Sequence, residues 1–412
     1  MALIQYAGFT ASEADSIRRA IGHKQPEVIN KWIPSFIDTL VNKIHNEYPD
    51  RDKDEVEETV SGLAQIIIDS SDYAFNKAHA KAYAYLTMLT AWFRTYHPVE
   101  WLTAGYTVWS DRHDKVSMLN RLAHAKGVKL DRMKFRKSKS YHFFDDNNTI
   151  FEGVLQVSGM NEKVGDFLHE YTVDKEYDTF TDFLMDVTDP FTVERDGEPI
   201  QSHLTLAKLP VDDVKAIDKD IKAGKLDVKA PDEIFTPNSR QVLALIRLDY
   251  FSEFGGSKKL ENTYENYRKK YNKTNKTLAS KHKNLNAVLE YEKGLDNDEH
   301  TLYDKANYEL DYLKKCTIVD ERIPAKYAVV SEIIKETKTY VMARIHSINK
   351  GISTDVKINR RLYANVPIKV GDIVSIESSK SQYKNANIEG QWIKTKDKEL
   401  WITNMTYVRK RK

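Results

Sequence analysis

The stretch YAVVSEIIKETKTYVMARIHSI, residues 327–348, marks a change in the apolar period of the chain. Apolar and polar side chains alternate in YAVVSEIIKE (327–336) and in YVMARIHSI (340–348), as in strands with one buried face. The segments VKINRRLYA (356–364), DIVSIESSK (372–380) and LWITNMTYV (400–408) continue this alternation. We therefore expect about five strands after residue 323, enough for a small closed barrel.

The chain before this point has a helical period. Pro26 is expected to begin a long helix, because apolar residues recur every three or four positions from Ile29 to Ile44. An earlier helix is expected to have Ser12 as its N-cap and to end near Gly22. A third helix should bury Val56, Val60, Leu63, Ile66 and Ile67, and a fourth should run from Ala78 to Tyr96.

These patterns predict an α+β multidomain protein with a mostly helical first part. We expect helical residues 1–128, a hairpin and small helices in residues 129–256, and a charged helical connector in residues 257–323. The hairpin is expected within residues 141–154, and a helix within residues 238–250. Residues 324–412 should form a five-stranded barrel of the oligonucleotide-binding (OB) type.

Composition indicates a soluble globular chain that resides in the cytoplasm. Among its 412 residues there is no apolar run as long as the roughly 18 residues of a membrane span, so no membrane partner is expected. The single cysteine, Cys316, excludes an internal disulfide and a zinc site built from cysteines. Its expected role is packing.

The formal net charge of +2 conceals basic segments that could contact phosphate. They lie at residues 129–139, 257–283 and 409–412. A solvated lysine-rich surface is the alternative interpretation of each segment.

Three segments in order resemble the family C replicative DNA polymerases, the bacterial DNA polymerase III alpha subunits. They are GFTASEADSIRRAIGHK (8–24), SDYAFNKAHAKAYAYLTMLTAWFRTYHPVEWLTA (71–104) and NSRQVLALIRLDYFSEFGG (238–256). FEGVLQVSGMNEKVGDFLHE (151–170) and YDTFTDFL (177–184) are similar to the family's helix-hairpin-helix element and the segment after it. The resemblance implies polymerase fingers, downstream DNA-binding modules and a terminal nucleic-acid-binding barrel.

The palm of this family, which carries the catalytic aspartates, has no counterpart here. The candidate aspartate pairs, Asp50 with Asp52 or Asp54 and Asp296 with Asp298, lie in polar turns and are interpreted as surface acids. We therefore expect no catalytic residue and no metal site in this chain. The resemblance implies that a separate palm-bearing chain holds Mg²⁺ and that the substrate is a deoxynucleoside triphosphate.

The resemblance also implies which residues meet the incoming nucleotide. Arg18 and Arg19 match the family's phosphate-binding arginines, and guanidinium groups suit phosphate because they make bidentate hydrogen bonds. Because consecutive residues lie about 100° apart on a helix, the alternative is that only one of the two reaches the ligand. Lys24 matches an adjacent lysine, whereas His23 replaces another. The remaining nucleotide-binding candidates are Tyr73, Asn76, Lys77, His79 and Tyr83 of YAFNKAHAKAY (73–83). For His79 and the two tyrosines, packing in the protein core is the alternative.

Candidate contacts to primer-template DNA lie farther along the chain. In the helix-hairpin-helix-like turn they are Gly159, Asn161 and Lys163, where Asn161 replaces the family's second glycine. In the barrel, the candidates are Lys335, Lys338, Lys350, Arg360, Arg361 and Tyr363, with Trp392 or Trp401 as stacking surfaces. Both tryptophans have a core role as the alternative.

The leading hypothesis is the carboxyl-terminal half of a split family C polymerase, and a bacteriophage with a divided polymerase gene is a reasonable source. Its expected partners are the palm-bearing chain and primer-template DNA. A sliding clamp is a further candidate partner, although residues 257–323 lack a glutamine-led, aromatic-ending clamp peptide. The alternatives are a non-catalytic DNA-binding or replisome-interaction protein derived from a polymerase, and an inactive fragment.

Overall fold

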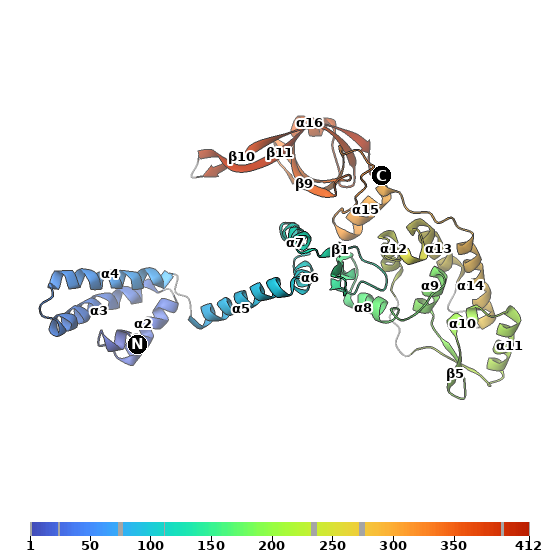
Figure 1. Cartoon of the computed structure of the whole chain (residues 1–412), viewed down its shortest axis with the longest axis horizontal. Coiled ribbons are helices and arrows are strands. Elements are labelled where there is room, and N and C mark those ends of the chain that lie inside the picture. The colour runs from blue at the N-terminus through green and yellow to red at the C-terminus, as the bar shows by residue number, and fades with distance from the viewer. Residues whose placement is uncertain are drawn as a thin grey trace. The chain divides into compact units, whose positions relative to one another are not determined.

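The computed structural model describes residues 2–23, 25–72, 77–110, 112–231, 237–271, 277–388 and 391–411. The chain divides into two compact units, Met1–Pro98 and Val99–Lys412. Helices dominate up to residue 313, and strands dominate after residue 327 (Figure 1). The expected α+β multidomain architecture is confirmed.

The first unit contains a helical bundle and one further helix. The bundle consists of α1 (Ala2–Gln5), α2 (Ala11–Gly22), α3 (Pro26–Glu47) and α4 (Lys53–Asp72). α3 and α4 lie side by side as a helical hairpin against which α2 packs (Figure 1). Their core contains Ile17, Phe36, Leu40, Val56 and Val60. The expected start at Pro26 and the apolar face of α3 are confirmed.

Two details of the bundle differ from the expectation. The N-cap of α2 is Thr10 rather than Ser12, because Thr10 and Glu13 form a reciprocal capping box. In α4, Leu63 and Ile66 are 45% and 62% exposed, and Ala64 takes a place in the buried face instead. The apolar residues of α4 therefore exceed what its buried face needs.

α5 (Lys77–Tyr96) follows the expected boundaries but is not buried. Every described side chain from Ala78 to Tyr96 is exposed. The exposed set includes large apolar side chains with 39% to 67% of their surface accessible: Tyr83, Tyr85, Leu86, Met88, Leu89, Trp92, Phe93 and Tyr96. A large contiguous apolar surface of this kind usually marks an interaction site.

The second unit begins with a small mixed module. α6 (Pro98–Val108) packs on α7 (His113–Lys126), where the Cα of Gly105 allows the close approach of Leu119. β1 (Lys129–Asp131), β2 (Phe143–Phe144) and β3 (Thr149–Phe151) form a three-stranded sheet. β2 and β3 are antiparallel, which confirms the expected hairpin.

The centre of the second unit is a larger α-helical core. Its elements are η1 (Val154–Gln156), α8 (Glu162–Glu170), α9 (Phe180–Thr188), β4 (Thr192–Arg195), β5 (Glu198–Ser202), α10 (His203–Ala207), α11 (Val211–Lys222), β6 (Asp227–Lys229), α12 (Ser239–Arg247), η2 (Ser252–Phe254), α13 (Ser257–Lys270), α14 (Leu278–Lys293) and α15 (Leu302–Leu313). The expected helix in residues 238–250 is confirmed, with Asn238 as its N-cap. α13 and α14, expected in a connector, pack in the same core as α9 and α12.

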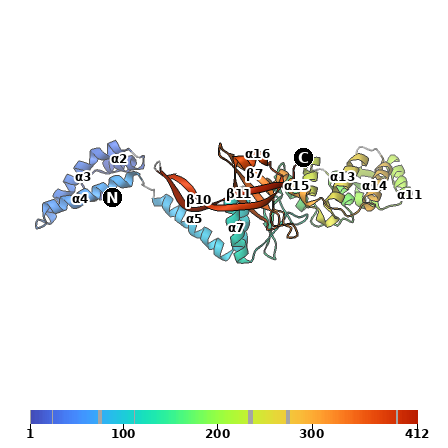
Figure 2. The ribbon, with the colours of Figure 1, turned by 90° about the horizontal axis from the view of Figure 1, so that it is seen from above.

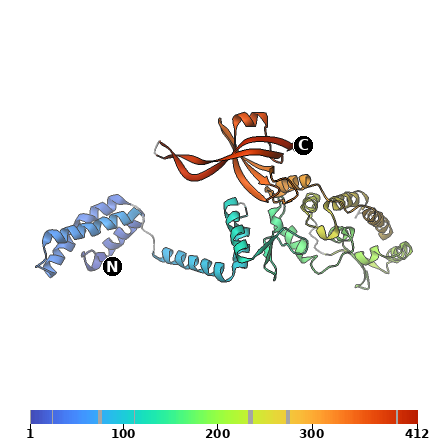
Figure 3. The same cartoon turned by 45° about the horizontal axis from the view of Figure 1, so that its top comes forward.

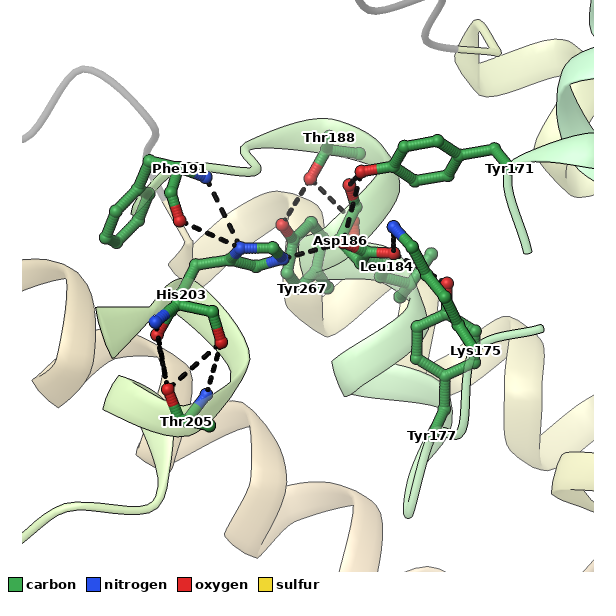
Figure 4. Close-up of polar contacts among 11 residues, drawn as sticks. Tyr171, Lys175, Tyr177, Leu184, Asp186, Thr188, Phe191, His203, Thr205 and Tyr267 are labelled. Carbon is green, nitrogen blue, oxygen red and sulfur yellow. Dashed lines mark hydrogen bonds and ion pairs between the residues drawn. The ribbon is translucent and has the colours of Figure 1, made fainter. Parts of the chain in front are cut away.

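A buried carboxylate, Asp186, ties several segments of this core together (Figure 4). It is 0% exposed and accepts hydrogen bonds from Lys175 at 2.8 Å, Tyr177 at 2.6 Å and Tyr171 at 3.2 Å, and it pairs with His203 at 2.7 Å. Burial acts to raise the pKa of Asp186, but the hydrogen bonds outweigh it and lower that pKa to about 2. The carboxylate thereby fixes the 171–177 segment against α9 and α10.

The last part of the chain is a closed five-stranded barrel, as expected. The strands are β7 (Tyr327–Glu336), β8 (Tyr340–Ser347), β9 (Ile352–Asn359), β10 (Ile373–Ile388) and β11 (Gln391–Arg409). Antiparallel pairs join β7 to β8, β8 to β9, β10 to β11 and β10 to β7, and a parallel β9–β11 pair completes the ring. Figures 2 and 3 show β10 and β11 continuing past the ring as a two-stranded arm.

One expected barrel strand is partly helical. Residues 356–364 were expected as a strand, but β9 covers 352–359 and α16 (Arg360–Asn365) follows it. The side chain of Asn359 accepts a hydrogen bond from the Leu362 amide and so caps α16. Because Asn359 caps the helix, β9 ends at Asn359 and α16 begins at Arg360.

The barrel and α15 share a core. Cys316 is buried there with Leu310 and Val329, and burial raises the pKa of its thiol to about 12. Its expected packing role is confirmed. The basic end of the chain also packs here, because the Arg409 guanidinium lies 3.7 Å from the centre of the Tyr303 ring and Arg411 pairs with Asp311 at 2.5 Å. These two arginines therefore have structural partners.

Candidate nucleotide and nucleic-acid interfaces

The arginine pair of α2, Arg18 and Arg19, converges on one carboxylate. Arg18 donates from Nε to Asp15 Oδ1 at 2.9 Å, and Arg19 Nη2 lies 2.6 Å from Asp15 Oδ2. Consecutive helical residues point about 100° apart, yet these long side chains meet at a single anion. Their side chains are 72% and 64% exposed. Both guanidinium groups are therefore accessible to solvent and close enough together to bind the same anion.

The charge of Asp15 reflects this arrangement. The hydrogen bond from Arg18 is the main influence that lowers the pKa of Asp15. The carboxylate is therefore ionised at neutral pH and balances part of the positive charge of the two guanidinium groups.

The other nucleotide-binding candidates are placed only in part. Lys24, Tyr73 and Asn76 lie outside the described residues, and so does the side chain of Lys77. His79 and Tyr83 lie one turn apart on α5 with ring centroids 4.4 Å apart. Tyr83 is 58% exposed, so it has no core role in this unit. His23, at the C-cap of α2, is exposed.

The helix-hairpin-helix-like turn precedes α8. Gly159 has a φ of +86°, and a Cβ at this position would meet nothing within 4 Å, so the turn faces open space. Asn161 has an extended φ of −136° and caps α8 by accepting a hydrogen bond from the Val164 amide. The turn thus contains one left-handed residue, Gly159, and Asn161 caps the helix that follows it.

Contacts to neighbouring helices hold this turn in place. Gln241 donates to the carbonyl of Gly159 at 3.0 Å, and the Ser158 amide donates to the carbonyl of Tyr312 at 2.8 Å. Lys163 is exposed in the first turn of α8. An exposed helix N-terminus with a lysine beside it can hold a phosphate, although Glu162 in the same turn opposes it.

A groove on the outer face of the barrel brings basic and aromatic side chains together. Its cavity measures about 550 Å³. The lining residues are Lys335, Tyr340, Met342, Thr354, Asp355, Lys357, Ser381, Lys384, Lys398, Glu399 and Leu400. They come from β7, β8 and β9 and from the first part of the β10–β11 arm.

An aromatic pair lies at the edge of the groove, where Tyr340 lines it and Trp401 adjoins Tyr340, with a lysine beside them. The rings of Tyr340 and Trp401 meet edge to face at 5.7 Å. Lys357 lies 4.4 Å from the Tyr340 ring centre and 2.6 Å from Glu399, which also accepts a hydrogen bond from the Trp401 indole at 2.7 Å. Burial acts to raise the pKa of Glu399, but these hydrogen bonds lower it. Such a surface can stack a base and contact a phosphate.

The barrel candidates divide between this groove and other places. Lys335 lines the groove, and Lys338 is exposed in the adjoining β7–β8 loop. Arg360 on α16 donates to the Thr337 carbonyl at 2.6 Å and pairs with Glu336 at 3.0 Å, so it supports that loop. Arg361 is exposed on α16.

The remaining barrel candidates lie elsewhere. Tyr363 is on α16 beneath the Arg360 guanidinium, and Lys350 is exposed in the β8–β9 turn. The side chain of Trp392 is outside the described residues. Trp401 contacts Tyr340 beside the groove and is partly exposed.

Sequence reasoning missed Tyr340, Lys357, Lys384 and Lys398. The signal for the first two was present, because Val341, Ala343, Val356 and Ile358 are buried and their neighbours must face outward. The two lysines of the arm could not be found this way, because β10 and β11 extend beyond the predicted strands.

Within the described ranges, no group of three or more histidine, cysteine, aspartate or glutamate side chains could hold a metal ion. Asp52 instead accepts a hydrogen bond from the Asp54 amide at the start of α4. Asp296 and Asp298 are exposed beyond α14. Across the same ranges, no helix has both the length and the apolar character needed to cross a bilayer.

Comparison with known proteins links the chain to one kind of polymerase subunit. No family model matches the chain. It is 29% identical over 191 residues to the DNA polymerase III subunit alpha of Campylobacter jejuni, which covers 46% of this chain and 15% of that protein. The corresponding subunit of Aquifex aeolicus is 28% identical over 166 residues, or 40% of this chain and 13% of that protein.

A third relative adds to this likeness. The DNA polymerase III subunit alpha of Thermus aquaticus is 32% identical over 124 residues, or 30% of this chain and 9% of that protein. The chain is therefore similar to a part of DNA polymerase III subunit alpha, which confirms the expected resemblance. The matched stretches span less than a sixth of the length of these relatives.

Proposed function

We propose that this chain supplies nucleotide-binding fingers and DNA-binding modules to a DNA polymerase whose palm resides on a separate chain. The observation that carries the proposal is the exposed apolar surface of α5, which lies within one of the segments that resemble the polymerase family. Removing so large an apolar surface from water lowers the free energy of the system. A second polypeptide that packs on α5 would cover them.

The arginine pair supports a role in nucleotide binding. Phosphoryl transfer from a triphosphate requires positive groups around the phosphates, and two guanidinium groups that converge on one anion meet this requirement. His79 and Tyr83 of α5 offer a ring surface to a base or sugar. The substrate would be a deoxynucleoside triphosphate.

The palm-bearing chain would provide the catalytic aspartates and the Mg²⁺ ions. The aspartates of that chain would hold the ions, which would supply electrostatic stabilisation of the phosphate charge. The residues of this chain would bind and orient the triphosphate. Its role would therefore be positioning and electrostatic stabilisation, and activity would require both chains.

The second unit supports DNA binding. The barrel groove joins a stacking surface, Tyr340 with Trp401, to a lysine-rich margin, as in OB-type barrels that bind oligonucleotides through this face and its flanking loops. The open turn at Gly159 would contact a phosphate of the duplex. Primer-template DNA is thus the proposed nucleic-acid partner.

Co-purification and primer extension test this proposal. The chain is co-expressed with the products of the genes beside its own, and Mg²⁺-dependent extension of a primed template is measured. We expect extension only with a palm-bearing partner, and a loss of at least tenfold in Arg19→Ala. Arg51→Ala, which removes an equal charge from the same unit, should extend normally. If no palm-bearing partner binds the chain or restores extension, the proposal is wrong.

One observation favours the alternative of a non-catalytic DNA-binding protein derived from a polymerase. Arg18 and Arg19 are already paired with Asp15, and such pairing alone would satisfy a surface without a nucleotide. This alternative predicts that DNA binding is retained and that Arg19→Ala has no effect in any mixture.

A further inference from the structure

Asp15 occupies the position where the arginine pair would receive a phosphate. Its Oδ1 accepts from Nε of Arg18 and lies 2.8 Å from Nη2 of the same residue, and its Oδ2 lies 2.6 Å from Nη2 of Arg19. One carboxylate thus engages both guanidinium groups. A phosphate that binds the same pair must displace Asp15 or remain next to it.

Two effects of Asp15 on phosphate binding oppose each other. Asp15 holds both arginines in one place, which reduces the entropy that they lose when a ligand binds. It is also a negative charge beside a negative ligand, and one like-charge contact at 4 Å in water weakens binding about fivefold. A triphosphate carries several charges, whereas the ordering gain from exposed ion pairs is small. The repulsion therefore prevails.

We propose that Asp15 acts as an internal competitor of the triphosphate for Arg18 and Arg19. This inference rests on the proposed nucleotide-binding function. Without a bound anion, Asp15 pairs with both arginines, so an anion binds only if it interacts with them more strongly than the carboxylate does. Asp15 thereby raises the concentration at which any anion occupies the pair, and an anion with several phosphate groups offsets this through more contacts than orthophosphate can make.

A purely structural role for Asp15 predicts the opposite result. Carboxylates placed three and four residues before arginines stabilise isolated helices slightly. If Asp15 only stabilised α2 or anchored the arginines, its removal would weaken anion binding or leave it unchanged. The sign of the change therefore separates the two roles.

The test is calorimetric titration of inorganic tripolyphosphate into the full chain, at low salt and without Mg²⁺. We expect Asp15→Asn to bind about fivefold more tightly than the native chain. Asp15→Glu, which keeps the charge, should bind within twofold of the native chain. The double variant Arg18→Ala/Arg19→Ala should bind at least tenfold more weakly. Asp38→Asn, which removes an exposed carboxylate from α3, is the matched control and should not differ from the native chain.

The outcomes distinguish this inference from the proposed function. If the double arginine variant binds tripolyphosphate as well as the native chain, nucleotide binding at this pair is wrong. If the double variant binds weakly but Asp15→Asn does not bind more tightly, only the competitor role is wrong. An equal gain in Asp38→Asn would also overturn it, because net charge would then explain the effect. Circular dichroism of each variant verifies that α2 remains folded.

Discussion

α5 and α9 are both rich in large apolar side chains, yet α5 is exposed and α9 is buried. In α9, every residue from Phe180 to Val187 is buried. In α5, every described side chain from Ala78 to Tyr96 is exposed. The difference shows that apolar composition does not determine burial. A helix is buried only where other elements of the chain cover it.

The surroundings of α9 show what α5 lacks. Glu292 of α14 accepts hydrogen bonds from the Phe180 and Thr181 amides at 3.0 Å. These amides, in the first turn of α9, have no partner within the helix itself. The ring of Phe183 contacts the rings of Phe180 and Phe251 in the same core. In the second unit, helices distant in sequence converge on α9. α5 presents Trp92 and its neighbours to solvent, as an incomplete half of an interface would.

The largest expected effect compares equal truncations in the two helices. Phe183→Ala in α9 should lower the free energy of unfolding of the second unit by about 3–5 kcal/mol, because a buried ring is lost and a cavity remains. Phe93→Ala in α5 should change the unfolding free energy by less than about 0.5 kcal/mol. Urea unfolding of the full chain measures both. Equal losses would show that α5 is buried in solution.

The next prediction concerns Asp186, which ties α9 to the 171–177 segment. Asp186→Ala should lower the free energy of unfolding by about 3 kcal/mol, because the buried His203 and the partly buried Tyr177 and Tyr171 lose their shared hydrogen-bond partner. Asp178→Ala, which removes an exposed carboxylate next to that segment, is the control and should have little effect.

The pH dependence of this effect has a definite sign. Because the folded-state pKa of Asp186 is about 2, below its unfolded value, its contribution is complete above about pH 5 and is lost as the pH falls toward 2. Unfolding measured from pH 6 to pH 2 should therefore show a steeper loss in the native chain than in Asp186→Ala. Parallel curves for the two proteins would contradict the assigned network.

A third prediction uses the exposed ring of Trp92. Trp92→Ala should weaken binding of the palm-bearing chain by about 2 kcal/mol, roughly 30-fold, because buried aromatic anchors dominate protein interfaces. The stability of the isolated chain should not change. Titration calorimetry with the partner gives the affinity, and Tyr48→Ala, at an exposed tyrosine of the same unit, serves as the control. A normal affinity in Trp92→Ala would remove α5 from the interface.

The smallest expected effect concerns the aromatic side chains of the barrel groove, for which we propose a nucleic-acid partner rather than a protein. Tyr340→Ala in the barrel groove should weaken binding of single-stranded DNA by about 1–2 kcal/mol, because one stacking surface is lost. Fluorescence anisotropy with a labelled oligonucleotide measures the affinity. Tyr291→Ala, at an exposed tyrosine on α14, should bind normally. Equal losses in both variants would show that the groove has no special role.

Periodicity predicted most helices and the number of barrel strands, because core contacts repeat along each element. It failed where two local signals competed. Ser12 is an acceptable N-cap, but Thr10 is preferred because Glu13 completes its capping box. Likewise, alternation suggested a strand through residues 356–364, whereas the cap at Asn359 starts a helix. Local hydrogen bonds decided both boundaries.

For the candidate sites, the sequence predicted the chemical type of each side chain but not which side chains meet. Arg18 and Arg19 could be identified from the family resemblance, but their convergence on Asp15 depends on side-chain conformation. The exposure of α5 was not predictable either. Its apolar pattern is typical of a packed helix, yet its described side chains from Ala78 to Tyr96 are exposed.

Hydrogen exchange along α5 tests the central claim most directly, because it reports the same helix alone and in a complex. We expect the amides of residues 78–96 to exchange much faster than those of α9 in the isolated chain. Addition of the palm-bearing chain should slow them at least tenfold, whereas DNA alone should not. The account is contradicted if α5 is already as protected as α9 in isolation. It is equally contradicted if a partner that restores primer extension leaves the exchange of α5 unchanged.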